Sequence, residues 1–342
     1  MEYVGVAQME SGERATIYRS GCPLPPDVGP RLTWFLEGVF GAEEKPDLFV
    51  TAAAKGMYEE VARHAFGWAE RDGAIVSAAW TMTPHDDPRI GTLGEVYTDP
   101  AWRGRGMAGR VCQALLDRFD DAGGRVIFLA SENPVARRIY ERLGFLSFPR
   151  GLMRRERPPD EMFDEQWFRP GQLSIRLVHP GDTPRLVALY SAPSQWLSVA
   201  SPQGLYSAGR VTHDRCNSLV KHTWVATRAG AWFAMANAEG ALVGSGPMEP
   251  RGNEREPLGA EIDIFVHPAF VDHAGLLLAR MVQEGSERGW RWLIAQLGDD
   301  DTQKRELLEA TGFREVVRLA DALSFGGTRQ GLRILRMELG GG

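Results

Sequence analysis

The sequence predicts an α/β protein built from two consecutive domains. At 342 residues, the chain is longer than a single hydrophobic core usually serves. Residues 93–145 read in order as a strand, a glycine-rich turn, a helix, a strand and a helix, and a related order returns after residue 172. We therefore expect an internal duplication. Two pairs of dipeptides indicate it, each pair 168 residues apart: Asp99-Pro100 with His267-Pro268, and Gly144-Phe145 with Gly312-Phe313.

The composition is typical of a packed globular protein. Of the residues, 43% are hydrophobic and 25% are charged, and ten are tryptophan. No stretch approaches the roughly eighteen apolar residues of a membrane-spanning helix, and the first residues, MEYVGVAQMESGER, lack the basic start and apolar run of a signal peptide. We expect a cytoplasmic protein that does not associate with membranes.

Cysteines, charge and motifs exclude several kinds of site. Cys22, Cys112 and Cys216 form neither a disulfide framework nor a metal-spacing cluster, so buried thiols in a reducing compartment are expected. The net charge of −6 argues against nucleic acid as a partner. The seven histidines form no H-E-x-x-H motif, and no G-x-S-x-G motif occurs. We therefore expect no metal and no serine nucleophile.

The first half begins with a helix and a hairpin. Apolar residues recur at helical spacing over residues 30–40. Residues 64–82 favour two short strands joined at Arg71-Asp72-Gly73. A further strand follows Thr92 and runs to Asp99-Pro100. These elements are expected to build the core.

Two more helices and a buried strand complete the first half. The helix of about residues 107–122 repeats apolar residues at helical spacing, and Gly123-Gly124 ends it. Residues 126–130 are predicted to form a short buried strand. Asn133-Pro134 then opens a helix, because proline is well tolerated at a first helical position, and Gly144 ends that helix.

A linker is predicted between two domains of similar length. Residues 151–171 are rich in arginine, proline and acidic residues and show no periodicity, which favours a linker between domains of residues 1–150 and 172–342. Beyond the linker, residues 222–246 indicate paired strands, and residues 260–297 indicate a strand, a turn, a helix and a strand.

The glycine-rich turn predicts an anion site. Residues 103–109 lie between a strand and an amphipathic helix, so backbone N–H groups and the positive end of the helix can face a phosphate. Residues 104–109 also match the G-x-G-x-x-G pattern of dinucleotide-binding folds. Against that alternative, Asp99-Pro100 and three further residues separate the strand from the first glycine, and the proline removes a ladder donor.

Three motifs in residues 60–148 resemble the GNAT superfamily of acyl-CoA-dependent N-acyltransferases. The turn Arg103-Gly104-Arg105-Gly106-Met107-Ala108 fits that family's acyl-CoA pattern, Gln/Arg-x-x-Gly-x-Gly/Ala, at every defined position. The approach to it over residues 97–104 and the later segment over residues 133–145 are similar as well. Over residues 172–320 the resemblance is architectural only. It implies two tandem GNAT-like domains, each a mixed, mostly antiparallel sheet flanked by helices.

The resemblance also implies a reaction. The amine of an acceptor attacks the thioester carbonyl of an acyl-CoA directly, with acetyl-CoA as the expected co-substrate and no metal. A small-molecule primary amine is the first choice of acceptor and a protein or peptide amine the second. A non-catalytic acyl-CoA sensor is the alternative from a different class, and a homodimer is possible.

Site residues follow from the resemblance, position by position. Main-chain groups of residues 96–98 are expected to pair with pantetheine and polarise the carbonyl, and those of residues 103–109 to hold the diphosphate. The implied cofactor-binding residues are Val96, Tyr97, Thr98, Arg103, Gly104, Arg105, Gly106, Met107, Ala108, Gly109, Asn133, Ala136 and Tyr140.

Two of the implied residues are candidates for proton transfer. Glu95 is expected to act as the general base through water, the alternative being a strand glutamate that faces solvent or pairs with an arginine. Tyr140 is expected to protonate the departing CoA thiolate, the alternative being a tyrosine packed against Ala136 and Leu143. Asn133 either contacts pantetheine or caps its helix.

The second copy is predicted to be catalytically silent. Its turn, residues 268–275, is two residues shorter and lacks the Arg-x-x-Gly element, and Asp272 in it would repel a diphosphate. Leu308 stands where the first copy has Tyr140, and Asp301 where it has Asn133. Completing the core, covering the acceptor cleft or forming a subunit contact are the expected roles of this domain.

Overall fold

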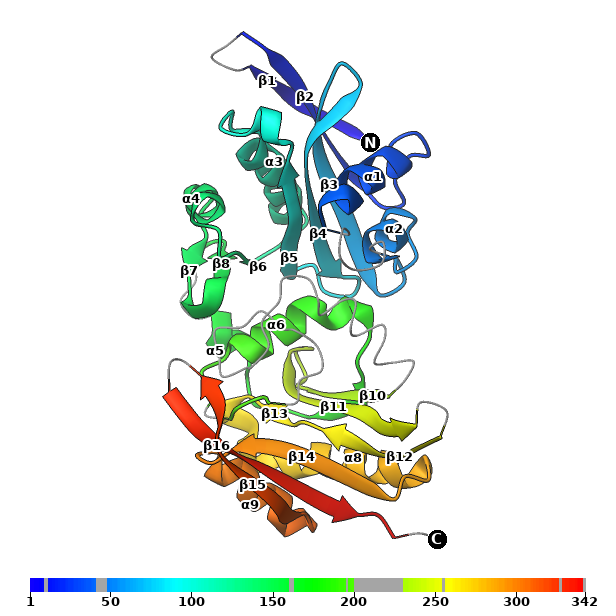
Figure 1. Cartoon of the computed structure of the whole chain (residues 1–342). Helices are drawn as coiled ribbons and strands as arrows, with labels where there is room; N and C mark the ends of the chain where they lie inside the picture. Colours follow the sequence, from blue (N-terminus) through cyan, green and yellow to red (C-terminus); the bar gives the residue numbers. More distant parts are fainter. Residues whose placement is uncertain are drawn as a thin grey trace. The chain divides into compact units, whose positions relative to one another are not determined.

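A computed structural model describes residues 1–8, 12–40, 48–159, 163–194, 196–199, 230–253, 256–325 and 328–340. The chain divides into two compact units (Figure 1). The first unit comprises Met1–Asp160 and Pro180–Pro184, and the second comprises Glu161–His179 and Arg185–Gly342. Each unit contains its own sheet.

The first unit is built on an eight-stranded sheet with the order β1-β2-β3-β4-β5-β6-β8-β7. Neighbouring strands run antiparallel, except that β5 and β6 are parallel. The strands are β1 (Glu2–Gln8), β2 (Arg14–Gly21), β3 (Ala62–Arg71), β4 (Ala74–Pro84), β5 (Ile90–Thr98), β6 (Val126–Ala130), β7 (Leu146–Ser147) and β8 (Leu152–Glu156).

Helices flank this sheet on both faces (Figure 1). Helix α3 packs on β2 to β5 through its apolar stripe, and α1 packs on β4 and β5. Gly67 on β3 permits the close approach of α3, because a Cβ atom there would lie 3.1 Å from Leu115 and 3.2 Å from Val111. The helices are α1 (Gly29–Phe40), α2 (Leu48–Ala54), α3 (Met107–Asp121) and α4 (Pro134–Arg142), with short 3₁₀ turns η1 (Pro100–Trp102) and η2 (Pro149–Gly151).

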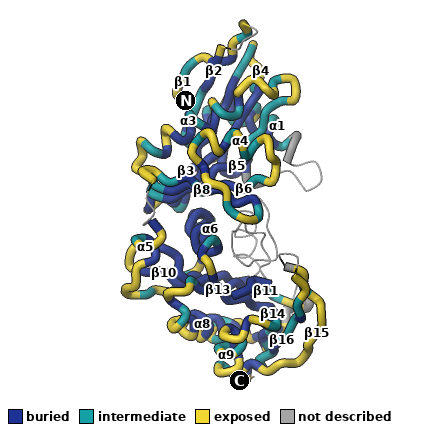
Figure 2. Tube along the Cα trace, turned by 90° about the vertical axis from the view of Figure 1, so that its left-hand side faces the viewer, coloured by how far each residue is buried: buried dark blue, intermediate teal, exposed yellow. Residues whose placement is uncertain are grey.

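The second unit is built on another eight-stranded sheet, with the order β15-β16-β14-β12-β11-β10-β9 and β13 paired to β11. Strand β10 is buried along its whole length (Figure 2). The strands are β9 (Ser174–Leu177), β10 (Ala231–Ala236), β11 (Leu242–Asn253), β12 (Glu256–Ile262), β13 (Phe265–Val266), β14 (Trp292–Gly298), β15 (Arg314–Phe325) and β16 (Thr328–Glu338). The helices are α5 (Phe163–Trp167), α6 (Thr183–Ser191), α8 (Ala274–Glu287) and α9 (Thr302–Thr311), with the 3₁₀ turn η4 (Pro268–His273). The 3₁₀ turn η3 (Pro180–Asp182) and the first two residues of α6 belong to the first unit.

The two sheets share one strand order. Strands β2-β3-β4-β5-β6-β8-β7 of the first unit correspond in turn to β9-β10-β11-β12-β14-β16-β15 of the second. The parallel pair falls at the same place in both, β5 with β6 and β12 with β14. The predicted fold class, two mixed and mostly antiparallel sheets flanked by helices, is therefore confirmed.

The start of the predicted linker belongs instead to the first sheet. Residues Leu152–Glu156 form β8, which pairs with β6 and β7. The strand has little apolar pattern because Arg155 is buried on it, where both of its terminal nitrogens donate to the Asp120 carboxylate at 2.8 Å. A charged residue that is buried by an ion pair reads as a surface residue in the sequence. Of the paired strands expected over residues 222–246, the part before residue 230 lies outside the described residues.

Two of the three cysteines are described, and both are free thiols. Cys112 is fully buried on α3, while Cys22 is half-buried, less than the sequence predicted. Burial raises the pKa of each thiol to about 12. Both side chains are therefore protonated at neutral pH and are poor nucleophiles. Cys216 lies outside the described residues.

Candidate active site

The glycine-rich turn leaves β5 through a capped 3₁₀ turn. The Asp99 carboxylate accepts a hydrogen bond from the Ala101 N–H at 2.8 Å and so fixes the start of η1. Gly104 and Gly106 then adopt left-handed conformations, with φ of 75° and 76°. A Cβ atom at either glycine would meet nothing within 4 Å. Backbone conformation, rather than crowding, therefore explains both glycines.

Helix α3 begins without a side-chain cap. Its N-cap is the left-handed Gly106, which has no side chain to offer. By contrast, the Asn133 side chain caps α4 by accepting from the Val135 N–H at 2.9 Å and the Ala136 N–H at 3.4 Å. The first turn of α3 thus presents main-chain N–H groups that no side chain satisfies, at the positive end of the helix dipole. This is a ready site for an anion.

The arginines of the turn are held by neighbours. The Arg103 Nε donates to the Thr98 carbonyl at 3.1 Å. The Arg105 guanidinium donates to the Glu13 carboxylate and lies 4.8 Å from the centre of the Trp102 ring. The Glu13 charge offsets that of Arg105, so the main chain of the turn is the stronger feature for a diphosphate. Met107 contributes only its main chain, because its side chain is buried in the core.

Strand β5 contains a bulge at its centre. Gly94 pairs with Trp80 and Tyr97 pairs with Ala78, so Glu95 and Val96 lie opposite a single residue of β4. Glu95 has a φ of 49°, in the left-handed region that costs a residue with a side chain about 1–2 kcal/mol. Bulges bend the strand and re-aim side chains, and strain of this kind is concentrated at functional sites.

Beside the bulge, β5 separates from β6. Their parallel ladder covers only three residue pairs, from Ile90 with Val126 to Thr92 with Phe128. From Leu93 to Thr98, β5 has no ladder partner on that side among the described residues. The sheet therefore opens between the two strands, next to the start of α3. Such an opening is what the resemblance requires for a pantetheine arm.

Glu95 is buried, with only 5% of its surface exposed. The alternative of a solvent-facing strand glutamate is therefore wrong. A carboxylate that is held in a bulge, next to the opening in the sheet, has the placement of a positioned proton acceptor. The sequence predicted Glu95 as a candidate residue but did not predict the bulge, because no local pattern in the sequence indicates it.

Tyr140 belongs to the hydrophobic core of the first unit. Its ring meets Phe145 edge to face, with the ring centres 6.1 Å apart, and Ala136 and Leu143 pack against the same cluster. The packing alternative is thus observed, and it fixes the ring. The role of the hydroxyl as proton donor remains a prediction.

Side chains around the end of β5 already engage two of its carbonyl groups. The Ser77 hydroxyl donates to the Tyr97 carbonyl at 3.2 Å, and Arg103 uses the Thr98 carbonyl. The Tyr97 ring packs against Phe35 of α1, with the ring centres 5.2 Å apart. Val96 packs partly buried against the core. The sequence did not indicate the contacts of Phe35 and Ser77 with Tyr97, because a helix aromatic and a strand serine carry no functional signal.

The comparison with protein families decides what this unit is. Residues 32–145 match the model described as "Acetyltransferase (GNAT) family". These residues form a GNAT acetyltransferase domain. The matched span runs from α1 to the end of α4 and contains all the candidate residues. The first unit is called the GNAT unit below.

Two curated relatives match part of this chain. A mycothiol acetyltransferase of Sanguibacter keddieii is 36% identical over 83 residues, which is 22% of this chain and 26% of the relative. The mycothiol acetyltransferase of Thermomonospora curvata is 36% identical over 97 residues, which is 27% of this chain and 31% of the relative. The matched segment therefore spans less than a third of either relative.

Solved structures also resemble this chain over about half its length. An N-acetyltransferase from Staphylococcus aureus Mu50 is 15% identical, with a TM-score of 0.41, and covers 50% of this chain and 100% of its own. A ribosomal-protein-alanine N-acetyltransferase from Brucella melitensis is 22% identical, with a TM-score of 0.40, and covers 48% of this chain and 99% of its own.

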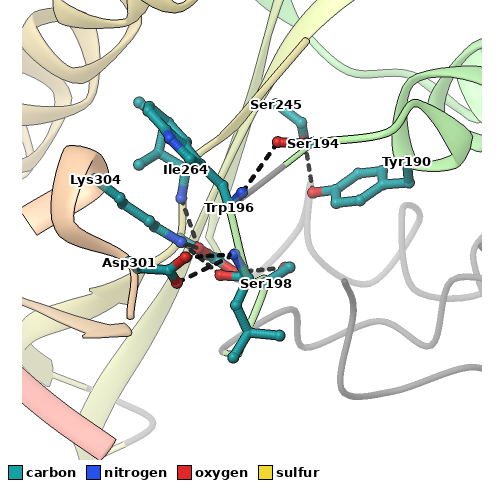
Figure 3. Close-up of polar contacts among 10 residues, drawn as sticks. Tyr190, Ser194, Trp196, Ser198, Ser245, Ile264, Asp301 and Lys304 are labelled. Carbon is teal, nitrogen blue, oxygen red and sulfur yellow. Dashed lines mark hydrogen bonds and ion pairs between the residues drawn. The ribbon is translucent and has the colours of Figure 1, made fainter. Parts of the chain in front are cut away.

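The corresponding place in the second unit is filled (Figure 3). At the 168-residue spacing, Glu95 corresponds to Asp263 and Ala136 to Lys304. Lys304 and Asp263 form a fully buried ion pair at 2.5 Å. Lys304 also donates to the Leu197 carbonyl at 2.9 Å, and the Ser198 hydroxyl donates to Asp263. A carboxylate persists at this position, but a lysine and a chain segment enclose it.

The turn of the second unit also differs in backbone conformation. His267 caps η4 by accepting from the Ala269 N–H at 3.2 Å, and η4 continues almost directly into α8. None of the described residues 268–275 adopts a positive φ. The two left-handed glycines that shape the turn in the GNAT unit therefore have no equivalent here.

The described part of the chain contains neither a grouped set of metal ligands nor a membrane-spanning helix. No three histidine, cysteine, aspartate or glutamate side chains among these residues are grouped as metal ligands. No helix in the same ranges is long and apolar enough to cross a membrane.

Proposed function

We propose that the GNAT unit transfers an acyl group, acetyl in the first instance, from acyl-CoA to a primary amine of a small molecule. One observation carries the proposal. The uncapped start of α3, shaped by two left-handed glycines, lies directly after the strand that opens away from β6. An anion-binding helix end next to a gap in a sheet suits a ligand with a diphosphate and a long, thin arm.

The proposed binding mode relies on the main chain. N–H groups of residues 106–109 hold the diphosphate, and the opening between β5 and β6 receives pantetheine. Backbone groups of Val96, Tyr97 and Thr98 orient the thioester carbonyl. Arg103 and Arg105 add positive charge near the phosphates, with Arg105 weakened by Glu13. Asn133 serves mainly as the cap of α4.

The proposed reaction begins with deprotonation of the acceptor. An amine with a pKa near 10.4 loses its proton at pH 7 at a cost of about 4.6 kcal/mol. Glu95 receives that proton through water, and the amine nitrogen forms a bond to the thioester carbon. The carbon–sulfur bond then breaks, and the Tyr140 hydroxyl protonates the departing thiolate. The nitrogen loses its surplus proton to solvent water as the amide forms, and Tyr140 takes a proton back from water. The products are the N-acylated acceptor and free CoA.

A small-molecule acceptor is preferred because both curated relatives are named for acetylation of mycothiol, a small molecule. For the second unit we propose no acyl-CoA binding. Lys304 stands where the GNAT unit has Ala136, and the Lys304–Asp263 pair removes the free carboxylate. The second unit then serves a structural role.

The test measures binding and turnover together. Calorimetry with acetyl-CoA should give one site per chain, and CoA release with a panel of small amines and peptide amines should show turnover on a small amine. Binding without turnover on any acceptor would support the sensor instead. Turnover on peptides alone would support a protein acetyltransferase, and two sites of equal occupancy would contradict a silent second unit.

A further inference from the structure

The GNAT unit contains a second polar cavity, away from the glycine-rich turn. Its volume is about 360 Å³, and β2, β3, β4 and the carboxyl-terminal end of α3 line it. From Gly106 to Arg118 the helix advances about 18 Å at its usual rise, so the cavity and the turn lie at opposite ends of α3. The cavity therefore does not belong to the proposed acyl-CoA site.

Positive charge predominates in the cavity lining. Arg19, Arg63 and Arg118 line it, and Asp121 is its only acidic lining residue. Arg19 is neutralised, because two of its nitrogens donate to the Glu2 carboxylate at 2.7 and 2.8 Å. In the part of the chain that the structure describes, no ion pair joins Arg63 or Arg118 to a carboxylate. Arg63 and Arg118 together carry two positive charges, and Asp121 balances one of them. About one positive charge therefore remains in the lining.

The Arg118 guanidinium lies close to Gly21 of β2. Its Nη2 atom lies 3.0 Å from the point where Gly21 would carry a Cβ atom. Any side chain at position 21 would therefore press on the guanidinium. Gly21 is not in a left-handed conformation, so the backbone does not require glycine there. The absence of a side chain instead leaves room for the Arg118 guanidinium.

Neutral residues complete the lining. One of them, His64, is held in place on β3, because its Nδ1 accepts a hydrogen bond from the Trp80 Nε1–H at 3.1 Å. Burial lowers the pKa of His64 to about 3, which keeps the ring neutral at physiological pH. Thr81 and Thr83 also line the cavity. Guanidinium groups beside neutral polar residues are a set that recognises oxyanions.

We propose that this cavity binds a small oxyanion, a phosphate or carboxylate metabolite, with Arg118 and Arg63 as its main cationic contacts. A volume of about 360 Å³ is at the lower end of ligand pockets and suits a compact anion rather than a nucleotide. The site is independent of the proposed acyl transfer, since none of its lining residues belongs to the turn or to β5.

Calorimetric titration with inorganic phosphate and, separately, with citrate tests the proposal and distinguishes the two oxyanion classes. Both titrations run in chloride at constant ionic strength. Arg118→Gln and Arg63→Gln should each lower the affinity for the more tightly bound of the two anions by at least about tenfold. Arg142→Gln is the matched control, because Arg142 is also an exposed arginine in the last turn of its helix. It should leave the affinity unchanged.

A further variant separates this site from the glycine-rich turn. Arg105→Gln should leave unchanged the binding event that Arg118→Gln and Arg63→Gln weaken, whatever it does to anion binding at the turn. Loss of binding in Arg105→Gln with full binding in Arg118→Gln would place the anion at the turn and overturn the proposal. Equal affinity in wild type, Arg118→Gln and Arg63→Gln would overturn it as well, and so would no heat from either anion at millimolar concentration. Circular dichroism confirms that each variant is folded.

Discussion

The two units share a strand order and differ at the few positions that chemistry requires. In the GNAT unit the β5 carboxylate is held in a bulge next to an open stretch of sheet, and α3 begins with left-handed glycine and no cap. In the second unit the corresponding carboxylate is locked to Lys304, and the turn is a regular 3₁₀ helix. The fold alone therefore does not provide a site. A few side chains and the conformation of one turn decide whether the same sheet contains one.

The largest expected difference concerns the paired carboxylates. Glu95→Gln should lower turnover by about 10²- to 10⁴-fold, the usual range for loss of a general base, while acetyl-CoA affinity changes little. The matched change in the second unit, Asp263→Asn, should leave turnover unchanged. Steady-state kinetics and calorimetry on both variants decide. Equal loss of turnover in both, or none in Glu95→Gln, would remove the proposed role of Glu95.

The buried ion pair should matter for stability only. Lys304→Met leaves Asp263 buried with no countercharge, which typically costs about 3–5 kcal/mol of unfolding free energy. Adding Asp263→Leu to it should restore much of that loss, because the unpaired charge disappears. Urea unfolding of the full chain measures both. Lys55→Met, at an exposed lysine of the GNAT unit, is the control and should change stability by less than about 0.5 kcal/mol.

The turn glycines give a smaller effect that is confined to binding. Gly106→Val forces a β-branched residue into a left-handed conformation and should weaken acetyl-CoA by about ten- to a hundredfold. Gly109→Ala is its control, since Gly109 has no positive φ and a Cβ atom there would make an ordinary contact, 3.6 Å from Ile139. Calorimetry that shows equal affinities for the two variants would indicate that the turn does not hold the diphosphate.

Much of this architecture was accessible from the sequence. The turn, its flanking helix and strand, and the Asn133-Pro134 helix start all carry strong local signals, and the structure has them close to the predicted bounds. The 168-residue spacing also identified the duplication. Such features depend on residues close together in the chain, where period, glycine and proline act directly.

What the sequence did not show depends on distant partners. The bulge at Glu95 arises from the pairing of β5 with β4, and nothing near Glu95 announces it. Strand β8 was hidden because Arg155 is neutralised by Asp120, 35 residues away. The Lys304–Asp263 pair likewise joins residues 41 apart, so no local pattern in the sequence indicates it. Buried charges therefore mislead sequence analysis wherever their partners are remote.

The smallest expected effect concerns the caps at the start of the two turns. Asp99 caps η1, and His267, 168 residues later, caps η4. Burial lowers the pKa of His267 to about 4, while the unfolded chain keeps a value near 6.5. Between these two pH values His267 is protonated in the unfolded state but neutral in the folded state. Stability therefore falls as the pH drops below about 6.5. The slope is at most about 1.4 kcal/mol per pH unit.

His267→Asn tests this reading of the cap. Asparagine also accepts from a backbone N–H at a helix start but does not titrate, so the variant should lose less stability than wild type between pH 7 and pH 5. Urea unfolding at pH 7, 6 and 5 measures the difference, and the carboxylates common to both proteins contribute equally to each. Parallel pH profiles for the two proteins would contradict it. His267 would then bind protons equally in the folded and unfolded states. Having histidine instead of aspartate as the cap would then not change the stability at low pH.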